Sequence, residues 1–380
     1  MSETRTTGTA LIPEDVVKLI RPDIMAMEPY TPVVPFEVLG EQLGRPPDEI
    51  IKLNANENPY GPSPRALEAL AALNGAASIY PDPEARRLRA LLADYVGVDA
   101  ACIMVGAGSD ELILLLASLF LAPGDAIIDC PPTFSMYPFN AAIAGARVVN
   151  VPRHPDFSLD VEGIERAARE SGARLIFLCS PNNPDGGVIA PADLDRLLAL
   201  PLIVVVDEAY HEFSSAESVA PRVPDTPNLI VLRTFSKWAG LAGLRVGYGI
   251  IPPPIIEHLW KIKQPYNVNV AADVAARATL KDLPRMQANV RKIVAERERL
   301  LRELSAISFL EPYPSQANFV LCRVTGIEAA TLRQWLEDEG ILIRYYNKPG
   351  LRDHVRITAG TPAQTDALLA ALRRIEAKTG

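Results

Sequence analysis

The stretch LIVVVDEAYHEF, residues 202–213, decides the fold, because five aliphatic residues run directly into a group of polar ones. The same pattern, a short apolar run that ends in polar or turn residues, recurs in AIIDC (126–130), ARVVNV (146–151), ARLIFLCS (173–180) and NLIVLRTFS (228–236). Buried parallel strands have continuous apolar runs of this kind. Segments with helical spacing accompany them, such as EARRLRALLADYV (84–96). The alternation predicts an α/β fold in which a large domain holds a mainly parallel, doubly wound sheet.

The last hundred residues predict a second, smaller unit. PRMQANVRKIVAERERLLREL, residues 284–304, has the length and the charge of a long helix. Strand-like and helical segments follow it in the order ANFVLCRV (317–324), a helix at 327–338, ILIRYY (341–346), HVRITAG (354–360) and a last helix from about 362. We therefore expect an N-terminal arm at 1–45, a large domain at 46–283 and a small C-terminal α+β domain at 284–380.

Composition argues against several classes of function. The 380 residues carry a formal net charge of −8, whereas nucleic-acid binders usually have a basic excess. No run of 18 apolar residues is present to form an ordinary membrane span, and MSETRTTGTA (1–10) lacks the pattern of a signal peptide. The four cysteines lie far apart and are typical of core residues in a reduced protein, and the four histidines have no ligand spacing. We expect a cytoplasmic protein with no metal, no nucleic-acid partner and no membrane contact.

Asp207 is the first candidate for chemistry, because ligands of open α/β sheets bind beyond the carboxyl ends of the strands. A carboxylate directly after five aliphatic residues is expected to be half buried, where ionisation is costly unless a cation faces it. Two interpretations remain open at this point. The carboxylate either caps a helix or is satisfied within the core, or it pairs with a protonated heterocycle or a metal, and the histidine spacing argues against the metal.

The turn Gly106–Glu111 is the second candidate. A glycine-rich turn that opens an apolar helix offers free backbone N–H groups and a positive helix end to a phosphate. It lacks the lysine of a P-loop and the third glycine of a dinucleotide fingerprint, so ATP and NAD both fit poorly. Ser109 as an ordinary N-cap is the competing interpretation.

Lys237, in TFSKWAGLAGLRVG (234–247), is the third candidate. It follows an apolar strand and is flanked by Phe235 and Trp238, and such a setting lowers the pKa of a lysine and favours its nucleophilic free amine. Arg245, eight residues on, is suited to hold an anion. A lysine that forms a Schiff base, a strand-end aspartate that keeps a pyridine nitrogen protonated and a phosphate cradle together match the needs of pyridoxal phosphate.

At this point a family resemblance adds to the residue-level argument. From about Tyr30 to Gly360, the chain resembles the fold-type-I pyridoxal-phosphate-dependent aminotransferases, and most narrowly the histidinol-phosphate aminotransferase family. The motifs that carry the resemblance are LNANENPYGP (53–62), YPDPE (80–84), GAGSDE (106–111), PPTFSMY (131–137), SPNNPDG (180–186), VVDEAYHEF (205–213), RTFSKWAGLAGLRVGY (233–248), QPYNVN (264–269), SQANFV (315–320) and HVRITAG (354–360). The first and the eighth of these point to the narrower family.

The resemblance implies a set of residues around the cofactor, pyridoxal 5′-phosphate. Lys237 would form the Schiff base and later move the substrate proton, and Asp207 would pair with the pyridine nitrogen. The other implied contacts are Asn183 and Tyr210 to the phenolic oxygen of the ring, Tyr137 stacked on the ring face, and Ser109, Asp110 (through its backbone), Ser236 and Arg245 on the phosphate, with Thr234 nearby. Tyr60 would reach that phosphate from the other subunit, since the family is dimeric with shared sites.

The resemblance also implies how the substrates bind. Arg356 would bind the anionic end of the amino-acid substrate beside Asn183, and Arg344 and Tyr30 would bind the distal phosphate of histidinol phosphate. The implied reaction moves the amino group of L-histidinol phosphate to 2-oxoglutarate. One departure is Asp185, where the family usually has Thr or Ser, which adds negative charge near the site although Asp also suits turns.

Alternative functions remain on the same fold, because fold alone does not fix function. An aromatic amino acid aminotransferase and a threonine-phosphate decarboxylase share this scaffold. A regulator that keeps the cofactor site as a relic is a third reading, against which the intact Lys237, Asp207 and Arg245 argue.

Overall fold

The computed structural model describes residues 16–29 and 36–379 and contains two sheets. The larger sheet has the strand order β2-β8-β7-β6-β5-β3-β4. Its strands are β2 (Ile103–Gly106), β3 (Ala126–Asp129), β4 (Arg147–Asn150), β5 (Leu175–Cys179), β6 (Ile203–Asp207), β7 (Leu229–Thr234) and β8 (Gly247–Ile250). Only β8 runs antiparallel to its neighbours, so the expected mainly parallel sheet is confirmed.

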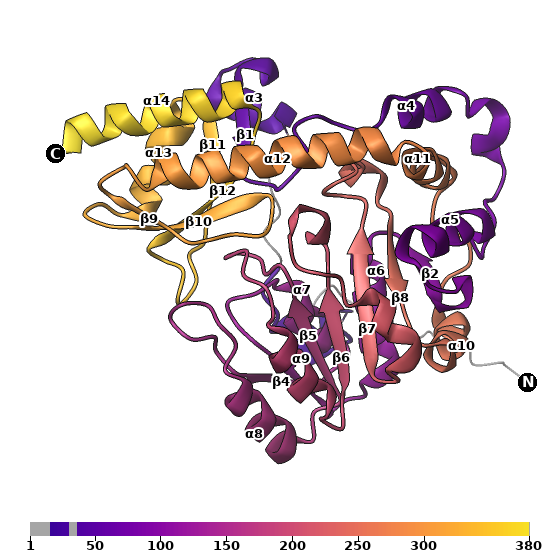
Figure 1. Cartoon of the computed structure of the whole chain (residues 1–380). Helices are drawn as coiled ribbons and strands as arrows, with labels where there is room; N and C mark the ends of the chain where they lie inside the picture. Colours follow the sequence, from indigo (N-terminus) through magenta and orange to yellow (C-terminus); the bar gives the residue numbers. More distant parts are fainter. Residues whose placement is uncertain (1–15, 30–35, 380) are drawn as a thin grey trace, which may run out of the picture.

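Helices cover this sheet on both faces, as a doubly wound fold requires (Figure 1). The helices of the large domain are α4 (Pro64–Ala71), α5 (Arg86–Val96), α6 (Ser109–Phe120), α7 (Met136–Ile143), α8 (Val161–Ser171), α9 (Pro191–Leu198), α10 (Pro253–Ile262) and α11 (Val270–Leu280). Before them in the chain come the short helices α2 (Pro22–Met25) and α3 (Phe36–Leu43). All four cysteines are buried and free, as expected for core residues.

The smaller sheet has the order β1-β11-β12-β10-β9. It consists of β1 (Ile51–Leu53), β9 (Leu310–Pro312), β10 (Phe319–Val324), β11 (Ile341–Tyr345) and β12 (His354–Thr358), with α13 (Ala329–Asp338) and α14 (Pro362–Thr379) packed nearby. The predicted helices and strands after residue 284 are therefore present. The boundary expected at residue 46 needs a correction, because β1 pairs in parallel with β11 and so lies in the C-terminal sheet.

Helix α12 (Leu283–Leu304) joins the two domains (Figure 1). Met286, Val290 and Ile293 near its start belong to the apolar core of the large domain. Leu300 and Leu304 near its end belong to the core of the small domain. A single rigid helix thus fixes the position of one core relative to the other. Within the described ranges, no helix is long and apolar enough to cross a membrane.

Candidate active site

A cavity of about 1550 Å³ lies at the carboxyl ends of the parallel strands, between the two domains. Its lining includes Asp207, Lys237 and Arg245 from the large domain and Arg344 and Arg356 from the small one. This is the position at which open α/β sheets bind ligands. The polar residues that follow separate strands in the sequence are therefore brought together.

Asp207 ends β6 and is 2% exposed. Its Oδ2 accepts a hydrogen bond from the Tyr137 hydroxyl at 2.8 Å, and its Oδ1 accepts one from the Ala209 amide at 3.1 Å. Burial raises the pKa of Asp207 to about 6, and the hydrogen bond from Tyr137 partly opposes this shift. The carboxylate is both hydrogen-bonded in the core and part of the cavity wall, so a cation placed beside it in the cavity would favour its charged form.

Lys237 follows β7 and lines the same cavity. Its Nζ lies 3.4 Å from the Ala55 carbonyl oxygen and 5.9 Å from the ring centroid of Tyr210. Burial and, next, the positive charge of Arg356 lower the pKa of Lys237 to about 8. The unprotonated share of the amine near neutral pH is therefore much larger than for an ordinary lysine, which favours a nucleophilic role.

The predicted phosphate cradle is present at the start of α6. Gly108, not Ser109, is the N-cap, with φ 79° and ψ 169°, and the helix begins at Ser109. Arg245 donates to Asp110 Oδ2 at 2.7 Å and to Ser236 Oγ at 3.3 Å, and Ser236 lies 2.9 Å from Thr234 Oγ1. A Cβ on Gly108 would stand 2.5 Å from Arg245 Nη2, so the close approach depends on glycine. The Ser109 N-cap interpretation is therefore wrong.

Arg356 on β12 organises the opposite side of the cavity. Its Nη1 donates to Asn183 Oδ1 at 2.6 Å and its Nη2 donates to the Asn54 carbonyl at 2.8 Å, while its buried Nε has no partner among residues 16–29 and 36–379. Arg344, on the neighbouring strand β11, has its guanidinium 5.4 Å from the ring centroid of Tyr346. Two arginines from adjacent strands thus face the same cavity.

Tyr210 lines the cavity and is buried, and this burial raises the pKa of its hydroxyl. Asn56 donates to that hydroxyl at 3.0 Å and accepts from Thr358 at 3.0 Å. The role of Asn56 was not predicted, although it stands in the LNANENPYGP motif. Its positive φ of 57° at a non-glycine position is a signal that only the structure reveals.

The position of Tyr137 differs from the prediction. Its ring is fully buried, stacked on Phe177 with centroids 4.9 Å apart, and it is absent from the cavity lining, which leaves it no free face for a cofactor ring. Phe134, three residues earlier, lines the cavity and meets Tyr137 edge to face at 5.5 Å. The PPTFSMY motif holds both aromatic residues, and the start of α7 at Met136 turns Tyr137 inward. Phe134 is the residue that sequence reasoning missed.

Three remaining predictions have different outcomes. Tyr30 lies outside the described residues. Tyr60 does not line the cavity of its own chain, and its ring centroid lies 5.1 Å from Lys292 Nζ of α12. Asp185 closes the turn rather than disturbing it, because its carboxylate accepts from the Gly187 amide at 2.8 Å and from the Asn182 side chain.

Comparisons with known proteins are consistent with this geometry. The family described as aminotransferase class I and II matches residues 48–372. A histidinol-phosphate aminotransferase from Roseiflexus castenholzii is 56% identical, over 96% of this chain and 100% of that protein. A chloroplastic histidinol-phosphate aminotransferase from Nicotiana plumbaginifolia is 53% identical, over 97% of this chain and 87% of that protein.

Solved structures are similar as well. The histidinol-phosphate aminotransferase from Sinorhizobium meliloti, in complex with pyridoxal-5′-phosphate, superimposes with a TM-score of 0.87 at 31% identity and covers 95% of this chain and 98% of that one. The L-threonine-O-3-phosphate decarboxylase from Porphyromonas gingivalis has a TM-score of 0.76 at 27% identity, with 86% of this chain and 99% of that one covered.

Proposed function

The chain belongs to the aminotransferase class I and II family, and we propose that it transfers the amino group of L-histidinol phosphate to 2-oxoglutarate in histidine biosynthesis. The products are imidazole acetol phosphate and L-glutamate. The observation that carries the proposal is the 56% identity to a histidinol-phosphate aminotransferase over that protein's whole length. The two arginines beside Lys237 support it, since both substrates carry an anionic group.

The cofactor is pyridoxal 5′-phosphate, and the residues of the cavity fit it. Arg245 lies close to Gly108 at the start of α6, so its positive charge and the first amides of the helix are both available to a phosphate. Asp207 is a buried carboxylate whose charged form needs a cation. When bound, this cofactor supplies a protonated ring that withdraws electrons from the carbon next to the substrate nitrogen. The residues around the cofactor would hold it in place, orient the substrate and move the substrate's proton.

We assign the holding contacts as follows. Asp207 keeps the proton on the pyridine nitrogen, and Ser109, Asp110, Ser236 and Arg245 bind the phosphate, with Thr234 behind Ser236. Asn183 accepts from Arg356 through Oδ1, so its Nδ2 can donate to the phenolic oxygen of the ring. Tyr210 accepts from Asn56, so its own proton is available to the same oxygen. Phe134 takes the place expected for Tyr137 at the ring face, because it lines the cavity.

Lys237 would hold the cofactor through Nζ, which lines the cavity. With the cofactor and substrate bound, Nζ would serve as the base that accepts and returns the substrate's proton, and a pKa of about 8 suits that role near neutral pH. Asp207 and Lys237, which line the same cavity, have different roles in this assignment. One keeps a charge in place, and the other moves a proton.

The substrate's distal phosphate is assigned to Arg356 and Arg344. The unpartnered Nε of Arg356 supports this assignment, since a buried guanidinium N–H without an acceptor is satisfied by an incoming anion. A planar guanidinium also meets two phosphate oxygens at once. Glutamate presents a carboxylate at a similar place, so the same arginines serve both half-reactions. The predicted part of Tyr30 in this site stays a proposal.

Comparing histidinol phosphate with histidinol tests the proposal. Losing a charge-assisted anion contact in a closed site costs on the order of 2–4 kcal/mol, so we expect histidinol to have a kcat/KM roughly 30- to 1,000-fold lower. Arg344→Ala should remove most of this discrimination. The matched control is Arg323→Ala, because Arg323 also lines the cavity but is paired with Asp353 at 3.0 Å, and its loss should leave the ratio unchanged.

A second function deserves its own assay because of the structural likeness to the P. gingivalis decarboxylase. Release of carbon dioxide from threonine phosphate by the purified protein would favour that activity. An equal kcat/KM for phenylalanine and histidinol phosphate would favour an aromatic amino acid aminotransferase. Preference for histidinol phosphate with no carbon dioxide release supports the proposed function.

We also propose a cytoplasmic homodimer. Ile79, Tyr80 and Tyr266 are 70%, 78% and 43% exposed, and the two tyrosine rings stack with centroids 4.5 Å apart. Grouped exposed apolar side chains mark interaction surfaces. Tyr80, whose side chain is 78% exposed, is a second candidate beside Tyr60 to reach the partner's site.

A further inference from the structure

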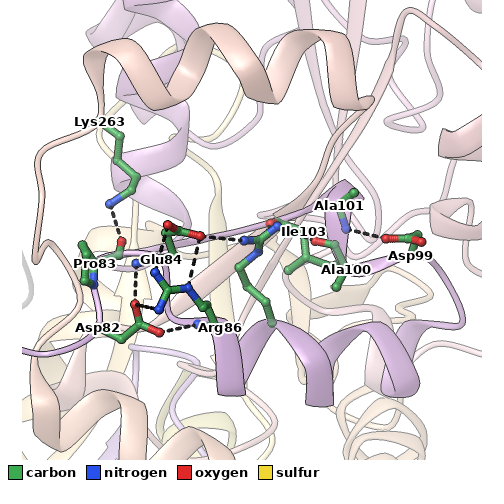
Figure 2. A network of polar contacts seen from close by, with 10 residues as sticks. Asp82, Pro83, Glu84, Arg86, Asp99, Ala100, Ala101, Ile103 and Lys263 are labelled. Carbon is green, nitrogen blue, oxygen red and sulfur yellow. Dashed lines mark hydrogen bonds and ion pairs between the residues drawn. The ribbon is translucent and has the colours of Figure 1, made fainter.

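The segment Asp82–Arg86 forms a closely hydrogen-bonded loop in front of α5 (Figure 2). Asp82 accepts from the backbone amides of Glu84 and Arg86 at 3.1 and 3.0 Å, and Arg86 donates to Glu84 at 3.1 Å. Figure 2 also shows Lys263, at the end of α10, reaching the carbonyl of Pro83 at 3.3 Å. The loop is thereby tied to a lysine from a distant part of the chain.

Lys263 continues this network toward the cofactor site. Only 9% exposed, it donates to the Gln264 carbonyl at 2.9 Å and to Asn267 Oδ1 at 2.7 Å. Asn267 in turn donates through Nδ2 to Glu111 Oε2 at 2.6 Å and to the Val105 carbonyl at 3.3 Å. The same Glu111 oxygen accepts the backbone N–H of Ala107 at 2.6 Å. The network thus ends on the turn that opens α6.

This arrangement decides which amides of the turn remain for a phosphate. The Ala107 N–H donates to Glu111, and the Gly108 N–H donates to the Gly106 carbonyl at 2.8 Å. The first amides of α6, those of Ser109 and Asp110, are left to point out of the helix end. Through its contact with the Ala107 N–H, Glu111 therefore holds the backbone of the turn in place, although its negative charge by itself opposes an incoming phosphate.

A simple helix-capping role does not account for Glu111. An acidic side chain in the first turn stabilises a helix by itself. The Glu111 carboxylate, however, accepts from the Ala107 amide, which precedes the N-cap, and from Asn267 of another segment. Lys263 donates to Asn267, so Asn267 links the buried amine of Lys263 to the carboxylate of Glu111. Lys263, Asn267 and Glu111 are thus joined by hydrogen bonds that end on the turn before α6.

We propose that Glu111, Asn267 and Lys263 are positioning residues that hold the 106–109 turn in the conformation that binds the cofactor phosphate. This inference rests on the proposed function, since it presumes that the cradle takes that phosphate. The inference predicts that removing these residues weakens the binding of a ligand that carries the phosphate and leaves the binding of one without it nearly unchanged. Pyridoxal, which lacks the phosphate but can still react with Lys237, is the comparison ligand, because every contact to the ring cancels in the ratio of the two affinities.

The experiment measures dissociation constants of pyridoxal phosphate and pyridoxal for the cofactor-free, full-length protein by absorbance titration. We expect Glu111→Ala to lower the preference for pyridoxal phosphate by tenfold or more, with little change for pyridoxal. Glu111→Gln should retain the preference, because the amide oxygen can still accept from both Ala107 and Asn267. Asn267→Ala should lose part of the preference for pyridoxal phosphate. It gives a second measurement if Glu111→Ala does not fold.

Glu376→Ala is the matched control. Glu376 also accepts a backbone N–H at 2.6 Å, that of Ser308, but it lies on α14 away from the cavity, so its loss should leave the ratio of affinities unchanged. An unchanged ratio in folded Glu111→Ala, or in Asn267→Ala where the first variant does not fold, overturns the positioning role. A wild-type protein that does not prefer pyridoxal phosphate overturns the proposed cofactor site instead.

Discussion

At the scale of single residues, the fold holds Lys237 in an unfavourable state. The amine is surrounded by protein and faces Arg356 in the same cavity, and within the described part of the chain its one hydrogen-bond partner is the Ala55 carbonyl at 3.4 Å. Burial of a charged amine without a carboxylate partner costs free energy. The same feature that makes Lys237 a nucleophile therefore weakens the protein that has no cofactor bound.

This conflict predicts a pH-dependent stability difference for Lys237→Met. The pKa of Lys237 is about 8 in the folded protein, against about 10.4 in an unfolded chain. Below pH 8 both states carry the proton and the folded state bears the full cost of the buried charge. Between these two values the folded state has lost the proton and the unfolded state keeps it, so wild-type stability rises with pH.

We therefore expect the cofactor-free Lys237→Met protein to be more stable than wild type at pH 7, and this advantage should shrink as the pH approaches 10. Urea unfolding at both pH values measures it. Lys281→Met, at an exposed position, serves as the control with a pH-independent difference. The same advantage for Lys237→Met at both pH values would contradict the assigned pKa.

At the scale of elements, the start of α6 depends on one backbone conformation. Gly108 has φ 79° and ψ 169°, a region that only glycine adopts readily. Gly247 on β8 is a second close approach, since a Cβ there would lie 2.5 Å from the Ser109 amide. Both glycines bring backbone next to the cradle without a side chain in the way.

Gly108→Ala should affect stability and cofactor binding together. The backbone strain costs about 1–3 kcal/mol of unfolding free energy, and the new methyl group displaces Arg245 from the cradle. Urea unfolding and a pyridoxal phosphate titration measure the two effects. Gly97→Ala is the control, because Gly97 has φ 80° with no atom close to its missing Cβ, so it should lose stability alone. Equal cofactor affinities in the two variants would mean that Arg245 adjusts freely.

The elements also explain what the sequence could and could not predict. The strands that end at Asp207 and Thr234, and the helix from Leu283, carry their own apolar pattern, so local reasoning finds them. Strand β1 has three residues, and only its pairing with Ile341–Ile343 makes it a strand of the small sheet. The pattern of the PPTFSMY motif likewise does not say which aromatic ring faces the cavity, because that depends on where α7 begins.

At the scale of the whole molecule, the cavity exists only because two domains meet. The segment after β1 leaves the small sheet and supplies the Asn54 carbonyl to Arg356 and the Asn56 side chain to Tyr210. Helix α12 fixes the relative position of the two cores. The single chain still leaves Ile79, Tyr80 and Tyr266 exposed, on the surface that we propose as the interface with a second copy.

Mixing chains tests whether a tyrosine crosses between subunits. In a heterodimer of a tyrosine variant and Lys237→Ala, one site carries both lesions and the other carries neither when the tyrosine serves the partner's phosphate. Equimolar mixing should then restore about one quarter of wild-type activity, since half of the dimers are mixed and half of their sites are intact. We expect this recovery with Tyr80→Phe, because Tyr80 is 78% exposed. Tyr60→Phe is tested in the same mixture, because the contact of its ring with Lys292 does not decide what its hydroxyl reaches. Recovery with Tyr60→Phe instead, once subunit exchange has been verified with tagged chains, would return the crossing role to Tyr60, and recovery with neither would place both tyrosines outside the partner's site.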